Sequence, residues 1–369
     1  MGYKERKELY EEIESLRGRP LIVYVTSIRS GMVGSMSGDV IRPIIDQLSV
    51  IPVDKKEVDF MIISNGGDPI ASLRIMSLLR ERFSNIAVLI PYVAYSAATI
   101  LALGADEIIM HPYSNLGPVD PQLNVAHKNA GGIPERLQFS SEDLVNYIEF
   151  VRKDIGITDQ QHLIEAATPL ISDVGALSIG NAKRGQRLSL SLSEKMLGWH
   201  LNDTEKIKSI SKALNSSYYH HGYAVGRKEA IDIGLTVKKP EESLEKAMWN
   251  VWLNFEEEMK CDEAFNPVAC IMSDKTAHDY LSTIPSVKIP VGIPDDIRNM
   301  IMQKVATSIA ITNQHPISVD PIIASVESIR MIKTYYNELS IHYWRNSDNS
   351  IGYSVTCVKS GWMNYKGEE

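Results

Sequence analysis

A serine between small residues is the first side chain whose type and surroundings suggest chemistry. Ser96 follows Ala94 and Tyr95 and precedes Ala97 and Ala98, where an apolar run ends and a helix-forming segment begins. A hydroxyl at such a turn lies at a helix N-terminus, and the backbone N–H of Ala97 can stabilise an oxyanion there. The pattern fits a nucleophile, although an ordinary helix N-cap fits it as well.

A double glycine follows the preceding apolar run, in the series Ser64-Asn65-Gly66-Gly67-Asp68. Glycine adopts backbone conformations that other residues resist, which can expose N–H groups at a helix N-terminus to an oxyanion, a phosphate or a carboxylate. The surroundings match neither GxxxxGK(S/T) nor GxGxxG, so nucleotide binding is poorly supported. A tight strand-to-helix turn is the alternative that the double glycine alone allows.

The elements that must position these residues alternate between strands and helices. Strands are predicted from apolar runs at 21–25, 58–63, 86–90 and 107–110, and helices from periodic segments at 40–48, 70–79 and 97–103. Strands separated by helices of this length form βαβ units, so we expect a mostly parallel sheet. The double glycine and Ser96 would then lie at successive turns between strand and helix.

Residues 83–105 carry no charge, and a bilayer is crossed by about 20 apolar residues. The stretch also contains Pro91, Gly104 and several polar side chains. These features favour a buried strand, a turn and a short helix over one membrane-spanning helix.

Beyond residue 122 the pattern becomes predominantly helical. Helices are predicted at 141–153, 159–167, 193–199, 205–214, 226–233, 241–259 and 322–339. Two alternating runs, at 341–344 and 353–358, are joined by residues 346–350, which have the composition of a hairpin turn. The end of the chain is therefore predicted to combine helices with a hairpin.

Composition limits the classes of function. The 369 residues are 44% hydrophobic and carry a net charge of −8, which indicates a globular protein of two or three domains and argues against nucleic acid or an anionic membrane surface as a partner. The three cysteines show no CxxC spacing, so neither a disulfide framework nor a zinc site is expected. The first residues lack the apolar core of a signal peptide, so we expect a cytoplasmic protein.

Three motifs occur in order within residues 62–122: I-I-S-N-G-G-D-P, then A-Y-S-A-A, then A-D-E-I-I-M-H-P-Y-S-N-L-G-P-V-D-P-Q. This series resembles the Clp-protease/crotonase superfamily of serine peptidases. It is most similar to the signal peptide peptidase A branch and its soluble relatives, the serine dehydrogenase proteinases. The resemblance implies an α/β spiral of βαβ units with helical additions and a small α+β C-terminal extension. It also implies that Ser96 attacks the substrate while Gly67 and Ala97 form the oxyanion hole.

The base and its orienting acid follow from the same resemblance. Clp proteases carry a histidine in the segment that here reads Leu-Gly-Pro-Val-Asp-Pro-Gln, where only Asp120 is available. Their orienting aspartate precedes an E-A-x-x-x-G-L helix, and here His220 and His221 precede it. Serine dehydrogenase proteinases have this exchanged order, which implies Ser96, Asp120 and His221 as the triad. His221 would be general base and then general acid, Asp120 would hold its tautomer, and His220 is the competitor for the base.

Three alternatives remain open at this point. A Ser/Lys dyad, as in signal peptide peptidase A, would use Lys128, Lys183 or Arg184, but such a lysine needs a desolvated environment. The fold could also persist as an inactive scaffold, or its oxyanion hole could serve an acyl thioester, as in crotonases. His111 ends a predicted strand and is interpreted as structural.

The resemblance also divides the chain and suggests its partners. It implies a peptidase-like domain at 20–240, which leaves a predicted N-terminal helix at 1–19 and a C-terminal extension at 241–369. The expected substrate is a polypeptide, and neither a cofactor nor a metal is expected. The superfamily forms rings, so a homo-oligomer, trimer or hexamer, is expected, with the amphipathic helix at 241–259 as the candidate contact.

Overall fold

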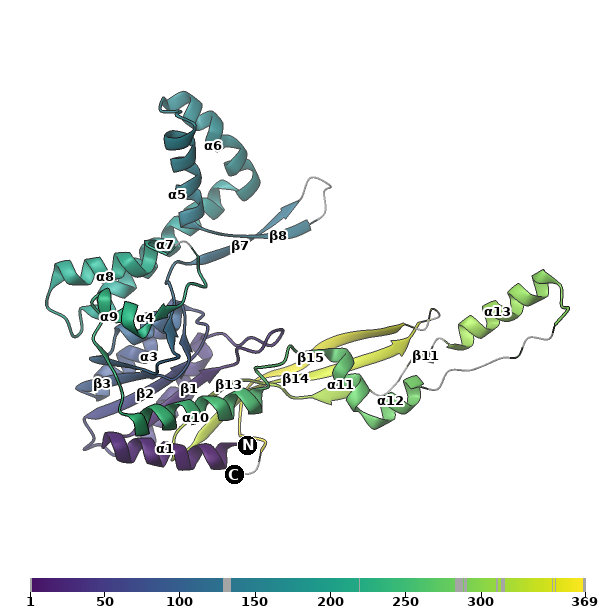
Figure 1. Ribbon diagram of the computed structural model, residues 1–369, viewed down its shortest axis with the longest axis horizontal. Coiled ribbons are helices and arrows are strands. Elements are labelled where there is room, and N and C mark those ends of the chain that lie inside the picture. Colours follow the sequence, from purple (N-terminus) through teal and green to yellow (C-terminus); the bar gives the residue numbers. More distant parts are fainter. Residues whose placement is uncertain are drawn as a thin grey trace.

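A computed structural model describes residues 2–128, 134–218, 220–282, 288, 291–309, 311–312, 316–346, 348 and 350–367. It shows a mixed α/β architecture built on a central sheet, as the sequence predicts (Figure 1). The parallel half of this sheet consists of β1 (Leu21–Thr26), β2 (Glu57–Ile63), β3 (Asn85–Ile90), β5 (Glu107–Met110) and β10 (Val237–Lys238). Strands β1, β2, β3 and β5 are buried on both faces, which is why they appear in the sequence as continuous apolar runs.

Antiparallel strands from the end of the chain continue the sheet. They are β11 (Ile311–Thr312), β12 (Ile317–Val319), β13 (Ile322–Glu327), β14 (Ile332–Arg345) and β15 (Ile351–Met363). The sheet order is β10-β5-β3-β2-β1-β13-β14-β11, and β12 and β15 also pair with β14. Strand β13 therefore joins the C-terminal segment directly to the parallel half.

Helices cover both faces of the sheet. Ile22 and Tyr24 of β1 face one core with α2 (Ile41–Val50), α3 (Pro69–Arg82) and α4 (Ala97–Leu103). Leu21, Val23 and Val25 alternate with them and face a second core with α1 (Tyr3–Arg17) and α10 (Glu242–Met259). Helix α10 lies in this second core and β13 lies in the central sheet, together with residues that precede position 240. The predicted domain boundary at residue 240 stays a prediction.

A second, small sheet lies where the parallel strands end. It has the order β4 (Val93–Ala94), β6 (Asn115–Leu116), β9 (Val225–Gly226). The uncharged residues 83–105 form β3, β4 and α4, which confirms the predicted strand, turn and short helix. Of the described helices, none is long and apolar enough on its own to cross a bilayer. One consecutive pair, residues 160–174 and 176–197, passes only jointly and is bent by 91°.

An insertion lies between β6 and β9 of the small sheet and projects away from the central sheet (Figure 1). It contains β7 (Gln122–Lys128), β8 (Pro134–Ser140), α5 (Ser141–Glu149), a π-helical turn (Phe150–Asp154), α6 (Gln160–Val174) and α7 (Ala176–Leu197). The chain returns through α8 (Thr204–Ser216) and α9 (Arg227–Asp232). The helical prediction beyond residue 122 is confirmed for α5, α6, α8 and α9, but it covered only the end of α7 and missed the β7–β8 hairpin.

The C-terminal segment corrects another prediction. Residues 322–339 form β13 and the start of β14, where the sequence predicted a helix. Their isoleucines, valine, threonine and tyrosines favour strands, and a turn in which the N–H of Ser328 donates to the carbonyl of Met331 joins them. The predicted hairpin at 341–358 is confirmed, with longer strands. The remaining helices are α11 (Pro267–Ser273), α12 (Lys275–Ser282) and α13 (Asp295–Ile309).

Candidate active site

Ser96 occupies the junction between β4 and α4 in a conformation that is rare for a residue with a side chain. Its φ of 52° and ψ of −117° make it one of two non-glycine residues with positive φ in the described chain. Its side chain makes no cap hydrogen bond to α4, so it is not an ordinary N-cap. Backbone strain of this kind persists where surrounding contacts enforce it, often at active sites.

The double glycine packs directly against this elbow. Gly66 has a φ of 97°, and a Cβ there would lie 2.5 Å from the carbonyl oxygen of Tyr95 and 2.9 Å from the Cβ of Ser96. Only glycine fits so close to the serine. Throughout the described residues, the backbone N–H groups of Gly67 and Ala97 donate to no acceptor. These are the two donors that the sequence predicts for an oxyanion hole.

Buried hydroxyl groups hold the two turns in place. Ser64 Oγ accepts hydrogen bonds from Thr26 Oγ1 at 2.8 Å and from the N–H of Gly66 at 3.0 Å. Thr99 Oγ1 contacts the carbonyl of Ala94 at 2.6 Å and accepts from the N–H of Gly117 at 3.1 Å. The elbow is therefore rigidly connected both to the double glycine and to the segment that leads to Asp120.

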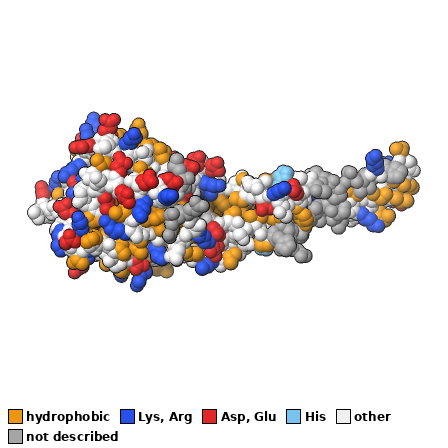
Figure 2. Space-filling model, turned by 90° about the horizontal axis from the view of Figure 1, so that it is seen from below, with side chains coloured by type: hydrophobic (Ala, Val, Ile, Leu, Met, Phe, Trp, Pro, Cys, Tyr) orange, Lys and Arg blue, Asp and Glu red, His pale blue; other side chains and the backbone are white. Residues whose placement is uncertain are grey.

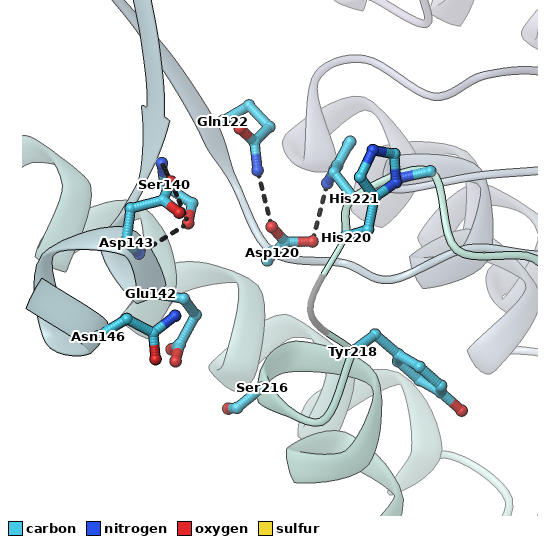
Figure 3. Close-up of a pocket in the computed structure, with 11 residues that line it drawn as sticks. Asp120, Gln122, Ser140, Glu142, Asp143, Asn146, Ser216, Tyr218, His220 and His221 are labelled. Atoms are coloured by element: carbon cyan, nitrogen blue, oxygen red, sulfur yellow. Dashed lines mark hydrogen bonds and ion pairs between the residues drawn. The ribbon is translucent and has the colours of Figure 1, made fainter. Parts of the chain in front are cut away.

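Asp120 and His221 meet although 101 residues separate them in the sequence (Figure 3). His221 Nδ1 lies 2.8 Å from Asp120 Oδ1, and Gln122 Nε2 donates to Asp120 Oδ2 at 2.7 Å. The N–H of Val119 donates to the carbonyl of Leu214, which ties the segment of Asp120 to the end of α8. A carboxylate at Nδ1 selects the tautomer whose Nε2 can accept a proton, which is the state that a general base requires.

The competing histidine is arranged differently. His220 Nδ1 accepts a hydrogen bond from the N–H of Gly222 at 3.0 Å, and its ring forms no hydrogen bond or ion pair with Asp120. His220 is exposed, whereas His221 is partly covered. The geometry therefore places His221, and not His220, beside the carboxylate.

The Asp120–His221 pair does not reach the hydroxyl of Ser96 in this conformation. Within the described part of the chain, Ser96 Oγ has no hydrogen-bond partner, and Ser96 is not among the residues that line the cavity beside His221. Both halves nevertheless belong to one small sheet, because β6 pairs with β4 before Ser96 and with β9 after His221. Gly117 also packs on the ring of Tyr95, next to the serine.

A cavity of about 470 Å³ opens beside His221. The residues that line it are polar: Asp120, Gln122, Ser140, Glu142, Asp143, Asn146, Ser216, Tyr218, His220, His221 and Gly222. Burial raises the pKa of Glu142, which accepts a hydrogen bond from Gln186 Nε2. Sequence reasoning missed Gln122 and Glu142. The D-P-Q motif could have pointed to Gln122, because its glutamine lies two residues after Asp120.

The other described candidates form no hydrogen bond or ion pair with Asp120 or His221. His111 is 5% exposed and stacks on Trp249 with 5.0 Å between ring centroids, and burial lowers its pKa, as suits a structural residue. Lys183 is exposed on α7 and donates to Gln186, and Arg184 donates to Asn181. The side chain of Lys128 lies outside the described residues. The described side chains contain no group of three or more potential metal ligands.

Comparison with known proteins covers the part of the chain that carries Gly67, Ser96 and Asp120, whereas His221 lies outside the matched residues. Residues 35–156 match the family described as ClpP-like SDH-type serine proteinase, which confirms the resemblance that the motif series predicts. An uncharacterized protein of Methanocaldococcus jannaschii is 30% identical over 201 residues, covering 54% of this chain and 60% of the relative. A second one from the same organism is 27% identical over 180 residues, covering 49% and 51%. The chain thus spans between half and three fifths of the length of these relatives.

Two solved structures are similar at low identity. The membrane-bound stomatin-specific protease 1510-N is 14% identical with a TM-score of 0.36, covering 62% of this chain and 84% of that chain. ClpP1 from Listeria monocytogenes is 13% identical with a TM-score of 0.32, covering 64% and 98%.

Proposed function

We propose that this Clp-protease-like chain of the SDH type is a serine peptidase that hydrolyses peptide bonds through an acyl-enzyme on Ser96. The observation that carries the proposal is the strained, unpartnered serine packed against a double glycine whose second N–H is free. The Asp120–His221 pair supports it, because a carboxylate-oriented imidazole is the base that a serine hydroxyl needs.

The proposed reaction assigns one role to each of these groups. Ser96 Oγ attacks the carbonyl carbon of the scissile bond while His221 Nε2 takes the hydroxyl proton, and the N–H groups of Gly67 and Ala97 bind the resulting oxyanion. Collapse of the tetrahedral intermediate breaks the C–N bond, and the leaving amine receives the proton from His221. Water, activated by the same imidazole, then hydrolyses the ester and restores Ser96.

The reaction requires His221 to approach Ser96 more closely than it does in this conformation. The loop between α8 and β9, which carries His221, is the element whose adjustment would close the gap. Catalytic hydrogen bonds often form only in the substrate complex, so the open geometry is compatible with the proposed role.

Labelling with a serine-reactive fluorophosphonate tests the nucleophile. We expect the wild-type chain to be labelled at Ser96 and Ser96→Ala to lose the label while its circular dichroism spectrum is unchanged. Ser84→Ala, at an exposed serine, is the matched control and should label normally. Labelling of Ser96→Ala at another residue would refute the assignment.

The same assay separates the triad from the Ser/Lys dyad. His221→Ala should reduce the labelling rate by about 10³-fold or more, whereas His220→Ala and Lys183→Ala should keep most of it. The exposure of Lys183 favours the triad, since a lysine base must be desolvated. Loss of labelling in Lys183→Ala with retention in His221→Ala would establish the dyad instead.

The wider biological setting follows from the proposed chemistry. We propose a polypeptide as substrate, a cytoplasmic location and assembly into a homo-oligomer. The cavity beside His221 is polar and open, which suits an extended peptide more than an apolar small molecule. An inactive scaffold is the alternative, and an unreactive Ser96 in the labelling assay would favour it.

A further inference from the structure

The long hairpin of β14 and β15 leaves one edge of the sheet open. Among the described strands, β15 pairs with β14 alone, so its outer edge presents main-chain N–H and C=O groups to solvent. Figure 1 shows the hairpin extending away from the helix-covered sheet, and Figure 2 shows hydrophobic side chains along this arm. Every residue from 353 to 360 is exposed, including Tyr353 at 44% and Val355 at 38%.

This outer edge has a regular part and a protected part. Residues 351–357 pair with residues 345–339 of β14 in unbroken register, and they carry no charge. Val358 is then an extra residue in a β-bulge, because Cys357 pairs with Leu339 and Lys359 with Glu338. Bulges and edge lysines are devices that stop strands from pairing with other chains. Both devices lie after residue 357, so residues 351–357 are left unprotected.

We infer that residues 351–357 pair antiparallel with the same residues of a second copy of this chain, about a two-fold axis at Ser354. In this register Tyr353 lies opposite Val355 of the other copy, Gly352 opposite Thr356, and Ile351 opposite Cys357. Aromatic and β-branched side chains form favourable cross-strand pairs, and no charge faces another. The two sheets then become one continuous sheet across the two arms.

Three features favour a second copy over an unrelated polypeptide. The segment is self-complementary, since the two-fold axis forms the Tyr353–Val355 pair twice. The bulge at Val358 and the charge of Lys359 end the pairing just beyond it, which gives a closed contact instead of an open-ended one. The arm also projects, so two arms can meet before the two bodies do (Figure 1).

The helix that the sequence predicts as the contact is occupied within the chain. The apolar side chains of α10 are buried against α1 and the central sheet: Leu244, Met248, Val251, Trp252 and Phe255. A self-assembly surface has to lie elsewhere. A two-fold contact at β15 gives a dimer, and together with a three-fold contact it gives a hexamer, but it excludes a bare trimer.

This inference extends the proposed self-assembly and does not depend on the proposed hydrolysis. Failure of the β15 contact would appear in the mass of the assembly, whereas failure of the peptidase proposal would appear in the labelling of Ser96. The two can therefore be tested on the same preparation without confusion.

Charge substitution at the axis tests the contact. Light scattering of the full chain should give an even number of protomers. Ser354→Lys and Ser354→Glu each place like charges opposite one another and should halve that mass. A 1:1 mixture of the two variants should restore the original mass, because Lys and Glu then face each other, and this recovery also shows that both variants are folded. A monomeric or odd-numbered wild type, unchanged mass in both variants, or failure of the mixture to recover would overturn the proposal.

Cross-linking checks the register. Paired residues on antiparallel strands have Cα atoms about 4.5–5.5 Å apart, within the range that a disulfide bridges. In a Cys357→Ser background, Ser354→Cys should form a disulfide-linked dimer on mild oxidation. Ser360→Cys, equally exposed but beyond the bulge, is the matched control and should stay largely monomeric on a non-reducing gel. Equal cross-linking at both positions would reject this register.

Discussion

The environment of Ser96 explains why two consecutive glycines are present. One supplies the oxyanion donor, and the other directly precedes it. Gly66 has no free N–H to offer, since its N–H donates to Ser64 Oγ. Its contribution is the absence of a side chain, which lets the backbone of Tyr95 and Ser96 approach. The double glycine thus combines two roles, close packing at Gly66 and an exposed N–H at Gly67.

Replacing Gly66 with alanine should therefore damage the elbow. A Cβ at this position lies 2.5 Å from the carbonyl oxygen of Tyr95, and the φ of 97° is unfavourable for alanine. We expect a loss of about 2–5 kcal/mol in the free energy of unfolding, from backbone strain and overpacking together. Gly38→Ala, with no atom within 4 Å of the new Cβ, is the matched control. Urea denaturation of both variants checks this, and equal stability of the two would contradict the packing argument.

Gln122 is a positioning residue that acts through Asp120. Its amide donates to Asp120 Oδ2 while His221 occupies Oδ1, so the carboxylate is held from both sides. Gln122→Ala should lower kcat by about 10-fold with KM nearly unchanged, since the lost hydrogen bond is the one to the Asp120 carboxylate. Gln161→Ala removes an exposed glutamine on α6 and should have no effect. A change confined to KM would instead indicate substrate binding.

The residues of the candidate site differ in how far the sequence could predict them. Ser96 and Gly67 lie inside short motifs whose chemistry can be argued locally. Asp120 and His221 required the family resemblance, because only the fold brings residues 101 positions apart together. Gln122 and Glu142 were missed because their contacts depend on side-chain rotamers at the insertion, which no local pattern encodes. The roles of all these residues stay predictions.

At the scale of elements, the sequence predicted helices and strands correctly where the hydrophobic periodicity fits only one of the two. The β1 to α4 region alternates between apolar runs and helical spacing, and its predicted elements match within a few residues. The helix prediction for residues 322–339 was wrong because Ile322, Val326 and Ile329 recur at helical spacing, although they lie in one strand and the turn that follows it. Their pairing with β1 is a contact between the two ends of the chain, and this tertiary context decides the structure.

One buried ion pair joins the first helix to these late elements. Arg6 of α1 forms two hydrogen bonds to Glu327 of β13 and one to Asn254 of α10, and both charged side chains are 0% exposed. Arg6→Met leaves the Glu327 carboxylate buried without its counter-charge, so we expect a loss of about 3–5 kcal/mol in the free energy of unfolding. Guanidinium denaturation measures this loss.

The double variant distinguishes the ion pair from simple packing. Arg6→Met combined with Glu327→Met removes both fully buried charges and should recover much of the lost stability, because the remaining partner of Arg6, Glu258, is in part exposed to water. Lys153→Met breaks an exposed pair with Glu149 and should cost less than about 0.5 kcal/mol. If the stability losses of the two single variants simply add in the double variant, the ion pair itself is not responsible for the loss.

On the scale of the whole molecule, the chain separates its anchored parts from its projecting parts. The central sheet is enclosed by α1 and α10 on one face and by α2 to α4 on the other, with a core of apolar side chains on each face. The insertion around α5 to α7 and the β14–β15 arm extend from this body in different directions (Figure 1). The first borders the candidate site and the second carries the proposed contact, so catalysis and assembly use different projections.

Two histidines in different parts of this body, the buried His111 and the half-buried His200, should make its stability depend on pH. Burial lowers the pKa of His111, behind Trp249, and of His200, whose Nε2 contacts the carbonyl of Leu103. In the unfolded chain, histidine has a pKa of about 6.5. Between that pH and the lower pKa values of the folded state, the unfolded state binds more protons than the folded state. Stability is therefore full above about pH 6.5 and falls as the pH decreases toward the folded pKa values. This pH dependence of stability has the opposite sign to that of a histidine whose folded pKa is raised by an acidic partner.

His111→Asn isolates one of these contributions. The asparagine oxygen can replace Nδ1 as the acceptor for the N–H of Tyr113, but it does not titrate. The variant should be less stable than wild type at pH 7.5, because the stacking on Trp249 is lost, yet its melting temperature should fall less between pH 7.5 and 5.5. His342→Asn, at an exposed histidine, controls for the substitution itself. A full wild-type decrease in His111→Asn would show that protonation of this buried ring does not contribute to the acid sensitivity of the fold.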